Sequence, residues 1–225
     1  MIFIEEDFQL KEEIHVKQDA GSKAEEIPAD VQEKEGQKPR ILNVGCGADE
    51  YGTDFVDLYP MREAIVKCNI EAEELPYSDN TFDEVYCRGL FEHLKNPNEY
   101  LRKVRRVLRP GGRVVIITDN ASYWVWALDK SLHRGGYEKP EHPDDRHFAL
   151  YTEHHMKNHL SEVGFVNVTT TLHAQPVYMG FGKRAFGKFV NGLFRITPLR
   201  KMAYMHLRAV GFKPVQEVAA VSGKS

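Results

Sequence analysis

The chain has 225 residues, enough for one α/β domain with a full hydrophobic core. Hydrophobic residues make up 42% and charged residues 28%, an ordinary balance for a soluble globular protein. The net charge of −3 argues against a protein that binds nucleic acid through overall positive charge, and we expect no DNA partner.

The first part of the chain differs in composition from the rest. Residues 1–16 alternate apolar and charged side chains, a pattern that predicts an edge strand or a lid over a ligand site. Residues 17–39 are rich in Lys, Glu, Gln, Gly and Ala, which predicts a solvated linker. Residues 1–40 carry eleven acidic and six basic residues. We therefore expect an acidic N-terminal extension, residues 1–39, ahead of the domain proper.

The three cysteines, Cys46, Cys68 and Cys87, are an odd number and form no C-x-x-C pair. This argues against a disulfide framework and for a reducing compartment. Each stands at or near a predicted strand end, where we expect a small buried residue. The sequence shows neither a signal-peptide pattern nor the roughly 18 apolar residues of a membrane-spanning helix, so we expect a cytoplasmic protein.

A glycine turn follows the first predicted strand. Ile41, Leu42 and Val44 form a short apolar run that is typical of a buried parallel strand. Gly45 and Gly47 come next, and glycine there allows a sharp turn and close approach of a ligand to the backbone. A tight turn that binds no ligand would show the same pattern.

The remaining strands and helices follow from apolar runs, caps and turn residues. Pro97 starts one apolar helical stripe, and a Thr cap with a closing Gly164 bounds another helix. Strands are predicted at residues 55–57, 65–68, 82–86, 114–117, 165–172 and 204–212, and helices at residues 97–108 and 152–163.

Four segments, in this order along the chain, resemble the motifs of the class I S-adenosylmethionine-dependent methyltransferases: residues 41–47, 75–83, 90–94 and 106–112. The likeness is to the broad subgroup that includes ubiquinone and menaquinone methyltransferases, with a type 11 methyltransferase domain. It implies an α/β fold with a doubly wound Rossmann-like sheet, mostly parallel with an antiparallel last strand. It also implies that residues 40–214 bind S-adenosylmethionine, which leaves as S-adenosylhomocysteine, with residues 215–225 as a tail.

The connection between the first two strands departs from this family pattern. Only residues 48–56 separate Gly47 from Asp57, whereas a full crossover helix would place the acidic residue about 20 residues on. We therefore predict a shortened first crossover helix. The carboxylate at Asp57 is well placed to accept hydrogen bonds from a ribose diol, and Asp54 and Glu50 are the alternatives.

The resemblance also implies which residues meet the cofactor. The backbone N–H groups of residues 45–47 would face its methionine carboxylate. Asn69 would accept a hydrogen bond from the adenine amino group, and Ile70 would pack on the ring. Arg88 stands at a strand's carboxyl end, where ligands bind in open sheets. The complete set of predicted cofactor-binding residues is Asn43, Gly45, Cys46, Gly47, Asp57, Leu58, Asn69, Ile70, Arg88 and His93.

Methyl transfer needs alignment of the acceptor and exclusion of water more than it needs a triad or a metal. An acidic acceptor atom can require a general base, for which His147, His93 and Tyr151 are the candidates. His155 and His159 share a helical face at a spacing that zinc sites use. The motif lacks its Glu and has no cysteine nearby, so we expect a solvated helix face and no metal.

A basic insert at residues 178–201 separates the last two predicted strands. Residues 181–213 carry eight basic residues and no acid. Phe186, Phe189 and Leu193 recur at helical spacing opposite Lys188, which predicts an amphipathic helix with a basic face. The helix can pack over the core, meet an anionic membrane surface or bind another protein.

Aromatic side chains after the fifth strand and in this insert favour a small apolar or lipid-like methyl acceptor. RNA or protein is the alternative acceptor, and a non-catalytic nucleotide-binding module on the same fold is a further alternative. A nicotinamide dehydrogenase fits less well, because the third glycine of its G-x-G-x-x-G fingerprint is missing.

Overall fold

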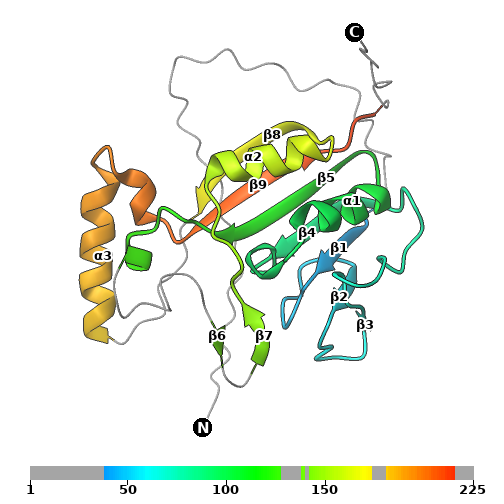
Figure 1. The fold of residues 1–225 in the computed structure, drawn as a ribbon, viewed down its shortest axis with the longest axis horizontal. Helices are drawn as coiled ribbons and strands as arrows, with labels where there is room; N and C mark the ends of the chain where they lie inside the picture. The colour runs from blue at the N-terminus through cyan, green and yellow to red at the C-terminus, as the bar shows by residue number, and fades with distance from the viewer. Residues whose placement is uncertain (1–37, 128–137, 140–141, 174–180, 216–225) are drawn as a thin grey trace. The chain divides into compact units, whose positions relative to one another are not determined.

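The computed structural model describes residues 38–127, 138–139, 142–173 and 181–215 (Figure 1). The chain divides into two compact units, residues 1–35 and 36–225, and every described residue belongs to the second. Nearly all of the predicted N-terminal extension lies outside the described residues, as do part of the loop after the fifth strand, the start of the insert and residues 216–225. The predicted domain boundary near Arg40 stays a prediction.

The second unit contains nine strands, three α-helices and three 3₁₀ helices within the described residues. In chain order they are β1 (Ile41–Val44), β2 (Asp54–Asp57), β3 (Ile65–Lys67), β4 (Phe82–Arg88), η1 (Phe91–His93), α1 (Pro97–Val107), β5 (Leu108–Asp119), η2 (Trp124–Ala127), β6 (Glu138–Lys139), β7 (His142–Arg146), α2 (Glu153–Glu162), β8 (Val166–His173), α3 (Phe181–Arg195), η4 (Arg200–Ala203) and β9 (His206–Phe212).

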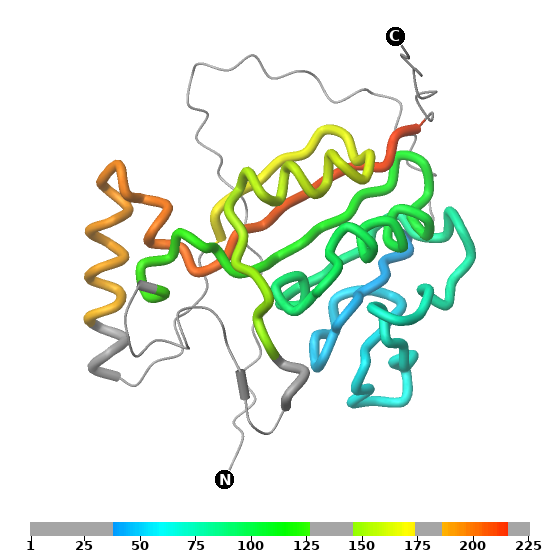
Figure 2. Tube along the Cα trace, in the orientation of Figure 1, coloured from blue at the N-terminus to red at the C-terminus, as the bar shows by residue number. Residues whose placement is uncertain are grey.

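Seven strands form one twisted sheet in the order β3-β2-β1-β4-β5-β9-β8. The first five are parallel to one another, and β9 runs antiparallel to both β5 and β8. Figure 2 shows β9 lying along β5 for most of its length. This arrangement confirms the predicted Rossmann-like sheet with an antiparallel last strand. A separate two-stranded ribbon, β6 and β7, was not predicted.

The parallel strands β1, β2 and β3 are joined without helices. Residues 45–53 and 58–64 contain only turns and bends. The prediction of a shortened first crossover is thus confirmed, and the second crossover is short as well. The first connection is closed by backbone hydrogen bonds, Gly45 N to Val56 O at 2.8 Å and Thr53 N to Ile41 O at 2.8 Å.

Two helices cover the sheet on the same side, α1 beside α2 (Figure 1). Pro97 starts α1, and the helix buries Tyr100, Leu101 and Val104 against the sheet. The Thr152 side chain caps α2 by accepting from the backbone N–H of His155. The core between these helices and the central strands is closed by fully buried side chains such as Leu42. Within the described residues, no helix combines the length and the apolar character needed to cross a bilayer.

The fifth strand begins earlier than the sequence predicts. Helix α1 ends at Val107, and β5 starts directly at Leu108, which pairs with Phe82 across an irregular register. The glycine turn at residues 110–112 lies inside this strand. A Cβ on Gly112 would lie 2.9 Å from the Arg109 carbonyl oxygen, so only glycine lets the bent strand pass here.

The apolar side chains of the insert helix α3 are exposed, although one alternative predicted that this helix packs over the core. Phe186, Phe189 and Leu193 are exposed to solvent. Asn191 packs inward, where its Oδ1 accepts from Trp124 Nε1 at 2.8 Å. The alternative that the helix buries Phe186, Phe189 and Leu193 over the core is therefore wrong.

Lys103 links α1 to the loop after β3. Its side chain is buried, and its ammonium donates to the carbonyl oxygens of Ile70 at 2.8 Å and Glu73 at 2.9 Å. These two bonds fix a loop that has no regular structure of its own. Because a carbonyl without a donor is costly to bury, Lys103 stabilises this loop, together with Arg106, which donates to the carbonyl oxygens of Leu75 and Tyr77.

We expect Lys103→Met to lower the free energy of unfolding by about 1–3 kcal/mol, because Met fills the stem but cannot donate to either carbonyl. Arg102→Met is the matched control, since Arg102 is exposed and pairs only with the exposed Glu99. That variant should change stability by less than about 0.5 kcal/mol. Urea denaturation of both variants makes the comparison. Equal stabilities would show that the loop does not need Lys103.

Candidate functional site

A cavity of about 310 Å³ lies at the carboxyl ends of β1 and β4, lined by Asn43, Gly45, Cys46, Gly47, Asp49, Arg88 and Gly89. Its volume is at the lower end of the range for small-molecule sites. Five of the seven residues are among those that the sequence predicts to bind the cofactor. The other two, Asp49 and Gly89, were not predicted.

The glycine turn shapes one wall of this cavity. Gly45 has φ +68°, and a Cβ there would lie 2.8 Å from the Leu90 side chain. Gly47 has φ +50°, and a Cβ there would meet nothing within 4 Å. Both positions favour glycine through their left-handed backbone. Position 47 additionally keeps space clear on the side where a ligand would approach.

The N–H groups of this turn bond within the protein, which corrects one expectation. Gly45 N and Cys46 N donate to Val56 O, at 2.8 and 3.4 Å, and Gly47 N donates to Asp57 Oδ2 at 2.8 Å. These N–H groups are therefore not directed at a ligand carboxylate. The expectation that they face the methionine carboxylate of the cofactor is wrong. The lining instead carries two opposite charges, since Arg88 Nη1 lies 4.0 Å from Asp49 Oδ2.

Asp57 ends β2 beside the turn, as predicted. Its Oδ2 accepts from Gly47 N and its Oδ1 accepts from Tyr59 N, at 2.8 Å each. A carboxylate has about four acceptor positions, so hydroxyl groups of a ribose can still bond here. Of the two alternatives, Asp54 stands at the amino end of β2, where it forms an ion pair with Arg40.

Asp54 is therefore at the wrong edge of the sheet and is excluded as the ribose ligand. Glu50, the second alternative, is exposed. Neither Glu50 nor Asp57 is among the residues that line the cavity, but Asp57 bonds directly to Gly47, which does line it.

Asn69 and Ile70, predicted to hold the adenine, lie on the loop after β3, and Leu58, predicted to bind the cofactor, lies on the loop after β2; none of them lines the cavity. Ile70 is 9% exposed, and Leu58 is half-buried. The Asn69 side chain accepts from Glu71 N at 3.1 Å through the same oxygen that was expected to meet the adenine. Their assignment to the cofactor stays a prediction.

Buried carboxyl groups gather at the ends of β4 and β5. Glu92 is 3% exposed, and its Oε2 accepts from Thr118 Oγ1 at 2.7 Å. Burial, with a further contribution from Asp119, raises the pKa of Glu92 to about 7. Burial also raises the pKa of Asp119 to about 6.

Histidines surround these carboxyl groups. Asp119 lies between His147, whose Nδ1 is 3.5 Å away, and His206, whose Nε2 is 3.3 Å away. Burial lowers the pKa of His206 to about 4, so this ring is neutral at pH 7. The His93 ring packs edge-on against His147 with centroids 4.7 Å apart, and its Nδ1 lies 3.0 Å from the Arg146 carbonyl oxygen.

The three predicted general bases thus have different environments. His93 and His147 share one cluster at the carboxyl edge of the sheet. Tyr151 is 4% exposed and packs against Phe91, and burial raises the pKa of Tyr151 to about 12. A phenol with that pKa keeps its proton at neutral pH, which suits a hydrogen-bond donor better than a base.

The histidine pair on α2 is not a solvated face throughout. His155 is exposed, as expected, but His159 is half-buried, with its Nδ1 2.7 Å from Asn98 Oδ1. Its ring packs against Phe91 and Tyr151. The expectation of a fully solvated face is therefore wrong for His159, which belongs to the packing between α2 and α1.

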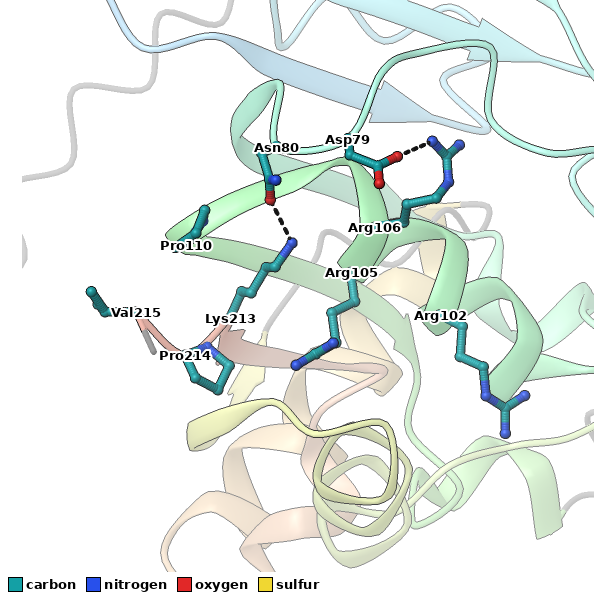
Figure 3. A pocket seen from close by; sticks show the side chains of 9 residues that line it. All are labelled: Asp79, Asn80, Arg102, Arg105, Arg106, Pro110, Lys213, Pro214 and Val215. Carbon is teal, nitrogen blue, oxygen red and sulfur yellow. Dashed lines mark hydrogen bonds and ion pairs between the residues drawn. The ribbon is translucent and has the colours of Figure 1, made fainter. Parts of the chain in front are cut away.

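A second cavity, of about 440 Å³, lies at the opposite edge of the sheet (Figure 3), lined by Asp79, Asn80, Arg102, Arg105, Arg106, Pro110, Lys213, Pro214 and Val215. Its polar groups already bond across it: Arg106 to Asp79 at 2.8 Å and Lys213 to Asn80 at 2.8 Å. It adjoins the amino ends of β4 and β5, whereas open α/β sheets bind ligands at the carboxyl ends. The smaller cavity is therefore the better candidate.

Sequence reasoning did not single out Glu92, Asp119 or His206. The first stands in the Leu-x-Glu-His motif and the second at a predicted strand end, so both carried a signal. His206 carried none, because it reaches Asp119 only through the antiparallel pairing of β9 with β5.

A mostly parallel sheet with an antiparallel seventh strand, a glycine turn after β1 and an acidic residue ending β2 together define a nucleotide-binding α/β domain of the methyltransferase type. The chain belongs to the methyltransferase domain family, whose sequence profile matches residues 16–170. By family and fold it is of the S-adenosylmethionine-dependent methyltransferase type, whose cofactor is S-adenosylmethionine.

Individual relatives match shorter stretches. Phosphoethanolamine N-methyltransferase 3 of Arabidopsis thaliana is 32% identical over an alignment of 105 residues that covers 37% of this chain and 21% of that protein. The ubiquinone/menaquinone biosynthesis C-methyltransferase of Idiomarina loihiensis is 45% identical over 47 residues, 21% of this chain and 19% of that protein. The chain thus matches about a fifth of the length of each of these two relatives, and these matches support the family more strongly than any subgroup.

Solved structures share the fold at low sequence identity. A S-adenosylmethionine-dependent methyltransferase from Archaeoglobus fulgidus aligns with TM-score 0.54 and 16% identity over 78% of this chain and 86% of that one. Phosphoethanolamine N-methyltransferase 2 of Haemonchus contortus, in complex with phosphomonomethylethanolamine and S-adenosylhomocysteine, aligns with TM-score 0.50 and 17% identity over 78% of this chain and 49% of that one.

We expect Asp57→Ala to weaken S-adenosylmethionine binding at least about tenfold, since losing an acceptor for two N–H groups and a ribose corresponds to more than roughly 1.4 kcal/mol. Asp54→Ala is the control on the same strand, because it removes a carboxylate that faces Arg40 at the other edge. Calorimetric titration measures both affinities. Unchanged binding by the Asp57 variant would remove this residue from the site.

Proposed function

We propose that this chain transfers a methyl group from S-adenosylmethionine to a small apolar or lipid-like acceptor that it meets at an anionic membrane surface. One observation carries the choice of acceptor: the exposed apolar side chains of α3 stand next to the aromatic segment that follows β5. The charges in the cavity and the position of α3 support the proposal in separate ways.

The residues of the smaller cavity suit an amino-acid group with both charges. Arg88 would attract the methionine carboxylate, and Asp49 would attract the ammonium group, as the two side chains stand 4.0 Å apart at one wall. Asp57 would accept from the ribose hydroxyls. When bound, S-adenosylmethionine supplies an electrophilic methyl group on a positively charged sulfur.

The position of the methyl acceptor is inferred from the segment that follows β5 at the carboxyl edge of the sheet. The chain continues from the end of β5 into η2, where Tyr123 and Trp126 are buried and Trp124 is half-buried. Trp124 bonds to α3 through Asn191 and contacts Phe186, with ring centroids 6.5 Å apart. Trp124 therefore links the segment after β5 to α3, whose exposed apolar side chains favour an apolar acceptor.

The outer surface of α3 suits insertion among lipids. Phe189 is 70% exposed, and Ile196 just beyond the helix is 84% exposed. Lys188 and Arg195 lie exposed on the same helix, and Arg200 on the following η4. Each basic residue near an anionic surface contributes roughly 1 kcal/mol of attraction, so apolar insertion and charge would act together.

A basic surface with exposed aromatic rings also suits single-stranded RNA, which stacks its bases on such rings. This is the second candidate function, with RNA or protein as the acceptor. The two candidate functions differ in which class of molecule receives the methyl group. A cell extract incubated with radiolabelled S-adenosylmethionine and then separated into lipid, small-molecule, RNA and protein pools distinguishes them. Label in the lipid or small-molecule pool supports the proposal.

We expect the chain to co-sediment with liposomes that contain anionic lipid, and both Phe189→Asp and Arg184→Glu/Lys188→Glu to reduce the bound fraction at least about threefold, since each removes apolar or electrostatic attraction. Met61→Asp is the control, because Met61 is 71% exposed on the loop after β2. No sedimentation of the unmodified chain, with label only in RNA or protein, would contradict the proposal.

A further inference from the structure

A compact set of metal-ligating groups lies at the carboxyl edge of the sheet, outside the cofactor cavity. Glu92, His93 and His147 each offer one ligand atom, and these atoms all lie within 4.8 Å of one another. Ligand atoms around one ion at about 2.0–2.2 Å lie no more than roughly 4.4 Å apart, so small side-chain shifts would close the site. We propose that these three residues bind a divalent first-row transition-metal ion such as Zn²⁺.

The neighbours of each ligand orient it as metal sites require. The Thr118 hydroxyl donates to Glu92 Oε2 at 2.7 Å, which fixes the carboxylate. On its other side, the nearest atom to a Cβ placed on Gly89 would be Glu92 Oε1, at 3.9 Å. The chain therefore has no side chain at position 89 that would cover this oxygen.

The histidines are oriented in the same way. His93 Nδ1 lies 3.0 Å from the Arg146 carbonyl oxygen, an arrangement in which Nδ1 carries the proton and Nε2 keeps a lone pair. His147 Nδ1 faces the buried Asp119 carboxylate at 3.5 Å. Metal-binding histidines almost always direct their second ring nitrogen at a carbonyl or carboxylate, which fixes the ring and raises its basicity.

A bound cation would stabilise the buried carboxyl groups of this cluster. Glu92 and Asp119 are 3% and 4% exposed, and two carboxyl groups in such surroundings are unfavourable unless a positive charge compensates them. One carboxylate with two imidazoles is typical of catalytic zinc sites and of related transition-metal sites that keep a position open. Mg²⁺ and Ca²⁺ prefer oxygen ligands alone, so this set disfavours them.

The assignment changes the role of two residues. His93 and His147, expected from the sequence as general bases or as a cofactor contact, become ligands, and the proposal departs from the expectation of no metal. Three protein ligands leave at least one coordination position for water or for an oxygen of the acceptor, a role that rests on the proposed function.

Cobalt binding tests the site directly. The full chain is stripped with a chelator, dialysed and titrated with Co²⁺ while its visible absorption is recorded, and Zn²⁺ is then added in competition. We expect one Co²⁺ per chain, displaced by Zn²⁺ and not by millimolar Mg²⁺. His147→Ala should weaken binding at least about a hundredfold, more than loss of an outer-shell partner does.

His154→Ala is the matched control, because it removes an exposed histidine of α2 and should leave Co²⁺ binding unchanged. Glu92→Gln provides a second variant that keeps an acceptor for Thr118, and circular dichroism confirms that both cluster variants fold. Absence of a one-to-one Co²⁺ complex, displacement by Mg²⁺ or wild-type binding by both cluster variants would overturn the proposal. The readout needs neither cofactor nor acceptor, so its failure would leave the methyltransferase assignment intact.

Discussion

The backbone N–H of Gly47 donates to the Asp57 carboxylate, and this 2.8 Å bond joins the ends of β1 and β2 where no helix connects them. Parallel strands normally need a crossover of a dozen or more residues. Here residues 45–53 make the connection, held by the bonds of Gly45 and Thr53 to the neighbouring strands. The left-handed glycines are what make so short a return geometrically possible.

That constraint places the functional groups. Because the turn is tight, its N–H groups bond within the protein, and the charges presented to a ligand come from side chains at strand ends, Arg88 after β4 and Asp49 in the turn itself. Two strands further along the sheet, antiparallel pairing sets His206 opposite Asp119. The cofactor cavity and the histidine cluster thus lie at one edge, as expected of ligand sites in open α/β sheets.

Much of this could be predicted from the sequence where local chemistry decides the outcome. An apolar run ended by glycine located β1, and Pro97 located the start of α1 to the residue. Predictions failed where contacts between residues far apart in the sequence determine a strand boundary or a side-chain position. The start of β5 at Leu108 depends on its pairing with Phe82, and the inward position of Asn191 depends on Trp124.

In the site too, features set by the local sequence could be predicted and features set by distant contacts could not. The family resemblance implied five of the seven residues that line the cavity. It could not show that Asp54 stands at the other edge, because strand direction becomes decisive only once β2 is placed in the sheet. Nor could it join Glu92 and His93 to His147, which approach each other only after β7 returns the chain to η1.

The central claim is that the carboxyl-edge cavity of this sheet holds S-adenosylmethionine. Calorimetric titration of the full chain with S-adenosylhomocysteine and, in parallel, with NAD tests it most directly. The account predicts one saturable site for S-adenosylhomocysteine and no heat of binding for NAD. Binding of NAD, or of neither compound, would contradict it.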